Sequence, residues 1–368
     1  MPDRPHADPR GPLAARAVRR WPPARRWKPL AAGAVRRRSR RRRRPLAAAL
    51  LVLAAAAAGC GGSSDRLSPA AEPARSPPLT TPPAGRVVPV GHKPEGLAFD
   101  PFTGLLAVGL TNPDRLALVD GESGRVVRRL RLPESPRHLT LAARGGPVLV
   151  PAERANAILE VSLPDGRVRS TRVGRFPHDA ARARGRLFVG DELGDTLSVV
   201  ERGRRVRVLE APVQPGGVSV TADREHVGVV GVRERALQLY DARTLRTAGT
   251  VDVGIGPTHL VGAGERFFVV DTRGDALIEV RVNPPRVHRR TQLEGAPYGI
   301  ALDTERRRYW VTLTAANRVV ELTDHRELRS FPTVRQPNSV AVDPISGRVF
   351  VASRKDGTLQ LIDPGPLR

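Results

Sequence analysis

Three histidines, His138, His178 and His259, each lie one or two residues after a proline. A neutral imidazole can ligate a metal ion, and its unperturbed pKa of about 6.5 lets it act as a base near neutral pH. Asp179 directly follows the second histidine and adds a carboxylate. The sequence contains no local metal motif such as H-E-x-x-H or paired cysteines. These side chains can therefore share a site only if the fold brings them together.

The prolines before these histidines belong to a series that runs along the chain. Successive members are 42, 41, 38, 42, 40 and 40 residues apart, and most lead into an apolar run. A repeat of about 40 residues made of short β runs is the signature of a propeller blade. The series consists of Pro94, Pro136, Pro177, Pro215, Pro257, Pro297 and Pro337. It predicts an all-β protein, a seven-bladed β-propeller with four-stranded blades.

The two ends of the repeat region predict how the ring closes. In the last repeat, strands are expected over 338–342, 348–352 and 358–362, separated by turns rich in Asp, Pro and Gly. The chain then ends before a fourth strand can form. Residues 86–90, before the first repeat, have the sequence of a fourth strand. We therefore expect the strand at 86–90 to complete the last blade and to remove the open sheet edges.

The repeats resemble the YVTN-type β-propeller repeat, a relative of the NHL repeat, over residues 86–363. The closest matches to its signature are 309–321 and 349–363. The resemblance implies the fold but leaves the function open, because such propellers include binding proteins, lyases, lactonases and redox subunits. Regucalcin-like lactonases and streptogramin lyases use metal ligands at the propeller centre. Their site residues cannot be matched one by one to this sequence.

The two residues after each repeated proline should lie at one mouth of the central channel, where inner strands begin. Three interpretations stay open for them: a divalent metal site, an acid–base site of histidines without metal, and polar strand ends that face water. The candidate ligand-binding residues are His138, His178, Asp179, His259, Tyr298 and Asn338.

The loops between the second and third strands of each repeat should open on the same face. They carry acidic and amide residues, among them Glu153 and Glu192. Such groups can bind a cation or sugar hydroxyls, but Asp, Asn and Gly are also what tight turns require.

A targeting segment precedes the repeats. A basic run from Arg36 to Arg44 is followed by an apolar run from Leu46 to Ala58. These 13 apolar residues are too few to cross a bilayer, which takes roughly 20, so the pattern predicts a signal peptide. Cys60, the only cysteine, follows directly. The segment resembles a bacterial lipobox, with Ala57 in place of the usual Leu, which implies a lipidated Cys60 as the mature N-terminus.

Four segments are therefore expected. Residues 1–34 form a disordered or wrongly assigned N-terminal extension, and 35–59 form the lipoprotein signal peptide. Residues 60–85, rich in Pro, Ser and Gly, form the lipidated cysteine and a tether. Residues 86–368 form the propeller. The predicted location is extracytoplasmic, anchored to the cell membrane by lipid.

The net charge of +24 is concentrated at the N-terminus, because residues 1–60 hold 16 basic and 2 acidic residues. No nucleic-acid partner is therefore expected. The expected partners are the membrane, through the anchor, and an unknown protein or small-molecule ligand, with the protein a monomer.

The sequence contains no G-x-S-x-G motif, phosphate-binding glycine loop or dinucleotide fingerprint. The main interpretation is thus a binding module at the cell envelope that performs no chemistry of its own. The alternatives are a metal-assisted lyase or lactonase built on the three histidines and Asp179, and a scaffold subunit that docks a partner.

Overall fold

The computed structural model describes residues 67, 69–324 and 326–367. The predicted N-terminal extension, the signal peptide and Cys60 lie outside these residues. The described residues belong to one compact unit, separate from Met1–Ser63. This unit holds all the sheets and interfaces described below.

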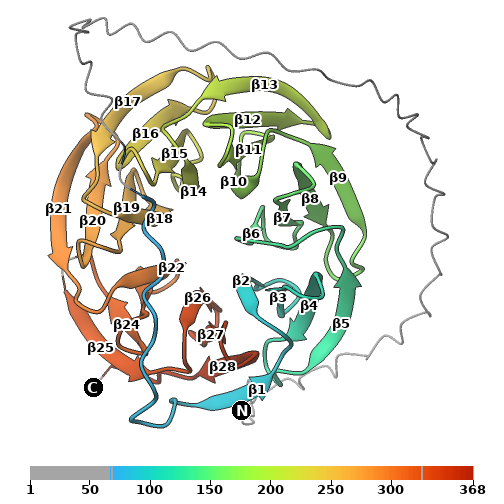
Figure 1. The fold of residues 1–368 in the computed structure, drawn as a ribbon, viewed down its shortest axis with the longest axis vertical. Helices are drawn as coiled ribbons and strands as arrows, with labels where there is room; N and C mark the ends of the chain where they lie inside the picture. Colours follow the sequence, from blue (N-terminus) through green and yellow to red (C-terminus); the bar gives the residue numbers. More distant parts are fainter. Residues whose placement is uncertain (1–66, 68, 325, 368) are drawn as a thin grey trace, which may run out of the picture. The chain divides into compact units, whose positions relative to one another are not determined.

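The described chain folds into seven four-stranded antiparallel sheets arranged as a ring, with no helix among the described residues (Figure 1). This confirms the predicted seven-bladed β-propeller. In each blade the strand that begins near a repeated proline lies innermost, and the following strands step outward to the rim.

In blades 1 to 3 the four strands follow one another from the axis to the rim in the order of the chain. Blade 1 consists of β2 (Pro94–Asp100), β3 (Leu105–Leu110), β4 (Arg115–Asp120) and β5 (Val126–Arg131). Blade 2 consists of β6 (Thr140–Leu141), β7 (Val148–Ala152), β8 (Ala157–Val161) and β9 (Val168–Arg172). Blade 3 consists of β10 (Pro177–Ala183), β11 (Arg186–Asp191), β12 (Thr196–Glu201) and β13 (Arg204–Glu210).

Blades 4 to 6 repeat this order, and blade 7 takes its outer strand from the other end of the repeat region. Blade 4 consists of β14 (Pro215–Val220), β15 (His226–Gly231), β16 (Ala236–Asp241) and β17 (Thr247–Asp252). Blade 5 consists of β18 (Pro257–Ala263), β19 (Arg266–Asp271), β20 (Ala276–Arg281) and β21 (Arg286–Gln292). Blade 6 consists of β22 (Pro297–Asp303), β23 (Arg308–Leu313), β24 (Arg318–Leu322) and β25 (Glu327–Pro332). Blade 7 consists of β26 (Pro337–Val342), β27 (Val349–Ser353), β28 (Thr358–Ile362) and β1 (Arg86–Pro89).

The ring closes where β1 pairs antiparallel with β28, with Val88 opposite Leu359. The side chain of Gln360 reinforces this closure by donating to the carbonyl of Ala84 at 2.7 Å. The predicted closure through the N-terminal strand is therefore confirmed. The pairing with β1 covers the edge of β28, which would otherwise be exposed.

The core is divided among the blade interfaces. Seven clusters of buried hydrophobic residues are found among the described residues, and each joins two neighbouring blades. The cluster at the closure packs Val90 and Leu97 against Phe350 and Leu359. This arrangement explains the apolar runs in the sequence, because strands covered on both faces require apolar side chains on both.

Most inner strands begin with an unusual turn. The residue before the repeated proline has a positive φ in five repeats although none of the five is glycine: Lys93, Phe176, Gln214, Ala296 and Gln336. Such a conformation is uncommon for a residue with a Cβ and is maintained by the surrounding structure. The turn redirects the chain from the rim of one blade to the axis of the next.

Part of the segment predicted as a tether lies against the propeller. Residues 69–77, which we call the strap, are extended and cross loops of blades 5, 6 and 7 (Figure 1). Ser76 is 5% exposed, donates to the carbonyl of Thr314 at 2.6 Å and accepts from the backbone N–H of Gln336 at 2.9 Å. The main chain of the strap also has partners in the propeller, because the carbonyls of Pro69 and Pro77 accept from Arg273 and Asn317, as those of a bound peptide would.

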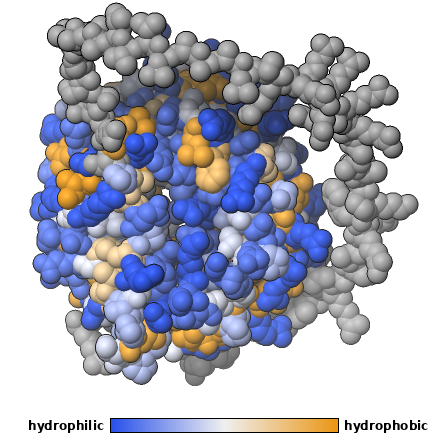
Figure 2. Space-filling model, in the orientation of Figure 1, coloured by the Kyte–Doolittle hydropathy of each residue, from blue (hydrophilic) through white to orange (hydrophobic). Residues whose placement is uncertain are grey.

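The face of the propeller in Figure 2 is mostly hydrophilic, with hydrophobic residues scattered over it. Exposed arginines are frequent on the outer strands, as in β9 and β13. Charged residues on edge strands oppose edge-to-edge pairing between molecules. Within the described residues no helix has the length and apolar character needed to span a membrane.

The closure generates a prediction about truncated chains. A chain that begins at Gly85 keeps β1 and should remain a folded monomer, whereas one that begins at Gly91 should aggregate. The second chain exposes the edge of β28 and removes Val90, which is 1% exposed and whose burial contributes about 1.5 kcal/mol or more. Gel filtration and thermal melting compare the two chains, which both lack the strap. Equal melting temperatures would contradict the closure as described.

Candidate functional site

The start of the inner strands positions the candidate residues. The ladder between β10 and β11 shifts register between Pro177 and Asp179, so His178 lies in a bulge. The ladder between β18 and β19 shifts between Pro257 and Leu260, which places His259 in a second bulge. A bulge turns a side chain away from the regular alternation of a strand and is common at functional sites. These bulges direct the imidazoles toward the axis.

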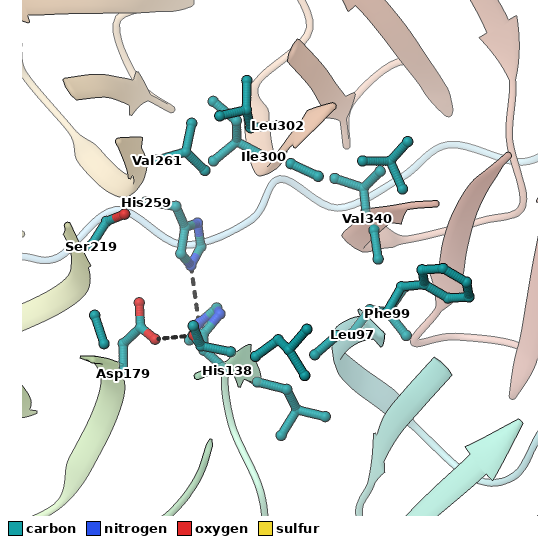
Figure 3. A pocket seen from close by; sticks show the side chains of 18 of the residues that line it. Leu97, Phe99, His138, Asp179, Ser219, His259, Val261, Ile300, Leu302 and Val340 are labelled. Atoms are coloured by element: carbon teal, nitrogen blue, oxygen red, sulfur yellow. Dashed lines mark hydrogen bonds between the residues drawn. The ribbon is translucent and has the colours of Figure 1, made fainter. Parts of the chain in front are cut away.

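The three predicted histidines meet there, and we call them the axial cluster (His138, His178 and His259). The Nε2 atoms of His138 and His259 lie 3.0 Å apart, as Figure 3 shows. The ring centroids of His138 and His178 are 4.8 Å apart, and those of His138 and His259 are 4.3 Å apart. The rings of Tyr298 and His259 pack edge to face, with their centroids 4.5 Å apart. Residues from blades 2, 3, 5 and 6 thus converge on one point.

Hydrogen bonds define the proton positions in the axial cluster. His259 Nδ1 lies 3.0 Å from the carbonyl oxygen of Tyr298, which can only accept, so Nδ1 is the donor. In neutral His259, Nε2 then accepts, and His138 Nε2 is the donor between the two rings. Burial lowers the pKa of His259 to about 3 and lowers that of His138 well below its usual range. Both rings are therefore neutral at physiological pH.

Glu192 fixes the orientation of the His178 ring. Its Nδ1 lies 2.8 Å from a carboxylate oxygen of Glu192, so Nδ1 donates and Nε2 keeps its lone pair in the neutral ring. Burial opposes the ionised form of Glu192, but the bonds from His178 and Gln214 lower its pKa to about 2. Two of the three histidines therefore have Nδ1 engaged by an acceptor. This leaves Nε2 of His178 as a nitrogen that can bind a further group, whereas Nε2 of His259 already accepts from His138.

A layer of charged side chains borders the axial cluster. Glu95 is 3% exposed and lies 3.1 Å from Arg354 and 3.7 Å from Arg137. Arg137 also lies 3.5 Å from Glu153. Burial opposes the charge of Arg137, but Glu95 and other nearby groups raise its pKa above the usual range. These pairs compensate charges that would be costly to bury alone.

The site is more enclosed than the sequence suggested. A channel mouth was expected to be wet, but His178 is 6% exposed, His259 8%, Tyr298 4% and Asn338 2%. The charged layer fills this end of the channel, and the strap crosses the adjoining loops of blades 5 to 7. The interpretation of these residues as strand ends that face bulk water is therefore corrected.

The channel itself is a cavity of about 460 Å³ on the other side of the axial cluster. His138, His259 and Asp179 line its inner end, and its walls are mostly aliphatic, including Leu97, Val261, Ile300, Leu302 and Val340 (Figure 3). Such a cavity has the size and polarity of a small-molecule site.

Asp179 occupies a bonded position in the wall rather than a free one. One carboxylate oxygen accepts from the backbone N–H of Val218 at 2.9 Å, and the other accepts from that of Ala180 at 2.8 Å. Thr140 also donates to it at 3.3 Å. Burial raises the pKa of Asp179 to about 6. The residue therefore connects blades 2, 3 and 4 and presents a weakly acidic group to the channel.

Asn338 lines the same cavity as His138, Asp179 and His259, but its side chain is bonded toward the strap. Its side-chain oxygen accepts from Gln336 at 3.1 Å, and Gln336 in turn donates to Ala74 of the strap. Conversely, the six candidates did not include Glu95 and Arg137, which lie at the same end of the channel, and Glu153 and Glu192 were considered only as loop residues. Glu153 and Glu192 directly follow the second strands of blades 2 and 3. Because these positions are equivalent in the repeat, the sequence could have predicted that the two carboxylates lie close together.

Other acidic loop residues serve turns, as the alternative interpretation held. Asp191 is fully buried and accepts from Ser198 and from the backbone of Gly174. Asp271 is also fully buried and accepts from the backbone of Gly256.

Two groups among the described residues have ligand atoms close enough to share a metal ion. One is the axial cluster, and the other consists of Glu153, His178 and Glu192. In each group the ligand atoms lie within 4.8 Å of one another. Three imidazoles suit Zn²⁺ and similar transition metals, whereas the carboxylate-rich group suits harder ions.

No family model matches the sequence, and no curated protein matches it. Solved structures do match the fold. Virginiamycin B lyase from Staphylococcus aureus is 13% identical with a TM-score of 0.64, covering 75% of this chain and 99% of that one. The Swd1 β-propeller domain of Myceliophteria thermophila is 14% identical with a TM-score of 0.67, covering 77% and 100%. Hydrazine synthase of Kuenenia stuttgartiensis is 14% identical with a TM-score of 0.65, covering 76% and 97%. At these identities the likeness shows the fold alone.

Proposed function

We propose that this protein binds a small ligand in its central channel. The observation that carries the proposal is the cavity of about 460 Å³ with aliphatic walls and convergent polar groups at its inner end. Cavities of this size and lining are the usual sites for small molecules. The His138 and His259 imidazoles and the Asp179 carboxyl would recognise a polar end of the ligand. A structural neighbour, a catalytically inactive histidine-to-alanine form of virginiamycin B lyase, is solved with quinupristin, which supports a ligand-binding role for this fold.

Blocking the channel tests this role. Val261 and Leu302 line the cavity and are only partly buried, so the double change Val261→Trp and Leu302→Trp should fill it with two indoles. Residues 64–368 should bind the apolar fluorescent probe N-phenyl-1-naphthylamine, and the double change should weaken binding at least about 10-fold. Fluorescence titration measures the affinity, and Val287→Trp on the exposed face of β21 is the control. Equal binding by blocked and control proteins would contradict the proposal.

The axial cluster favours a second candidate function, a metal-assisted lyase or lactonase. His178 and His259 each donate Nδ1–H to an oxygen, the arrangement that orients metal-ligating histidines. Two nitrogens on one tetrahedral Zn²⁺ lie about 3.3 Å apart, close to the 3.0 Å between His138 and His259. Because these two residues also line the channel, a metal bound here would act as a Lewis acid toward the ligand.

Metal titration separates this candidate from simple binding. Residues 64–368, stripped with a chelator, should take up about one equivalent of Co²⁺ with the visible bands of tetrahedral coordination. The triple change His138→Ala, His178→Ala and His259→Ala should abolish uptake, and Glu192→Gln should weaken it about 10- to 100-fold. His288→Ala, an exposed histidine on β21, is the control.

Either of two results would contradict a metal held by the three imidazoles. The first is uptake that survives the triple change. The second is uptake that depends on Glu153, His178 and Glu192 but not on His138 or His259, which would assign the ion to the carboxylate-rich group.

We further propose that the protein is exported and anchored by lipid on Cys60, so that the channel acts at the cell envelope. The support is the basic run, the short apolar run and the lone cysteine that follows it. Cys60→Ser should move the protein from the membrane fraction to the soluble extracytoplasmic fraction and abolish labelling by a fatty-acid probe. Cell fractionation measures the change, with a Ser63→Ala protein as the control. A Cys60→Ser protein that stays membrane-bound would assign anchoring to the uncleaved apolar run instead.

A further inference from the structure

The open end of the channel lies at the far ends of the inner strands. The axial histidines come at the beginning of β6, β10 and β18, whereas the opening is lined by residues that follow the ends of inner strands, such as Pro101, Arg144, Arg224 and Pro344. Apart from β6, the inner strands contain six or seven residues at about 3.3 Å each, which separates the two ends. The opening therefore has its own chemistry, independent of the axial cluster.

One side of the opening is basic. Arg144 lies in the turn between β6 and β7, and Arg224 lies in the turn between β14 and β15; both are exposed and line the channel. We call these two residues the basic lip. Arg224 Nη1 donates to the carbonyl of Ala142 at 3.1 Å, which holds its guanidinium beside the turn that carries Arg144. Two cations thus project from the turns of blades 2 and 4 at one side of an apolar channel.

The acidic groups near the basic lip already have partners within the fold, including Asp100, which accepts from the backbone N–H of Gly145 at 2.8 Å. Glu225 pairs with Arg184, and Glu160 pairs with Arg182. Asp223 accepts from the Thr221 hydroxyl at 2.6 Å and from the backbone N–H of Glu225 at 3.0 Å. Among the described residues that line the channel, Asp179 is the one carboxylate, and it lies at the inner end. The charged residues that line the channel are thus Arg144, Arg182 and Arg224 against Asp179, so the lining itself carries net positive charge.

Two exposed apolar side chains adjoin the lining residues of blades 1 and 7. Phe102 follows Pro101 in blade 1 and is 70% exposed, and Ile345 follows Pro344 in blade 7 and is 63% exposed. We call these two residues the apolar lip. They are the two most exposed large hydrophobic side chains among the described residues. Large apolar groups exposed at the rim of a pocket commonly mark a ligand-binding surface.

We propose that the channel takes an anionic amphiphile: its carboxylate, sulfonate or phosphate binds the basic lip, and its apolar body enters the channel past the apolar lip. This inference rests on the proposed function, since it names the class of ligand for the same cavity. A volume of about 460 Å³ accommodates a single-chain or ring-bearing molecule but not a two-chain phospholipid. The ligand is therefore a monomeric amphiphile rather than a membrane surface.

A matched pair of probes tests the inference. Residues 64–368 are titrated with the anionic 1-anilinonaphthalene-8-sulfonate and with the neutral N-phenyl-1-naphthylamine, which share the arylamine body. Arg144→Gln with Arg224→Gln should weaken the sulfonate at least about 10-fold, because a bond to a charged group is worth more than a neutral one, and should change the neutral probe less than about 2-fold. Arg144→Gln alone leaves the bond between Arg224 and the Ala142 carbonyl in place and should cause part of the loss of sulfonate affinity. Arg144→Lys, which keeps the charge, should restore that affinity.

The control is Arg172→Gln with Arg207→Gln, two exposed arginines on the outer strands β9 and β13. The inference is overturned if lip and control variants weaken the sulfonate equally, or if the lip variants weaken both probes equally. It is also overturned if phosphatidylglycerol vesicles bind the protein through the basic lip without displacing the sulfonate. The proposed function fails separately, when the Val261→Trp and Leu302→Trp changes leave binding of the neutral probe intact.

Discussion

The turn that starts each inner strand is the constraint on which the rest of the structure depends. The chain must travel from the rim of one blade to the axis of the next, and a proline preceded by a residue of positive φ makes this turn in most blades. The bulges that follow interrupt the ladder for one or two residues and direct those side chains inward. The same local geometry therefore builds the blades and supplies the residues at the axis. Because it recurs in most blades, side chains far apart in sequence become neighbours.

The axial end of the channel balances opposing electrostatic demands. Three imidazoles packed together are stable only when most of them are neutral, and burial achieves this by lowering the pKa values of His138 and His259. The adjoining carboxylates of Glu95 and Glu192 remain close to arginine or histidine partners. This separation places a neutral, nitrogen-rich surface toward the channel and the charges behind it. A lone pair on a neutral imidazole is what either a ligand or a metal ion requires.

The two faces of the propeller differ in what they offer to solvent. On the face of the axial cluster, the charged layer and the strap use the polar groups of the loops, as in the bonds of Ser76 with Thr314 and Gln336. On the other face the channel opens beside the basic lip and the apolar lip. The strap also connects the propeller to the segment that carries Cys60. Its hydrogen bonds to blades 6 and 7 attach the chain to the side where the channel is closed.

The sequence by itself determined the architecture, because fold information in a repeat protein is local and periodic. The proline spacing set the number of blades, and the missing fourth strand of the last repeat required 86–90 to close the ring. It also indicated which histidines could meet, since equivalent positions in a closed ring face the same axis. The tertiary structure decided the rest. Whether blades 2, 3 and 5 bring their imidazoles within bonding distance depends on the radius of the ring and on the bulges. The burial of the site, the pairing of His178 with Glu192 and the position of the opening depend on which loops pack over each face. These are contacts between residues distant in sequence, and no repeat pattern encodes them.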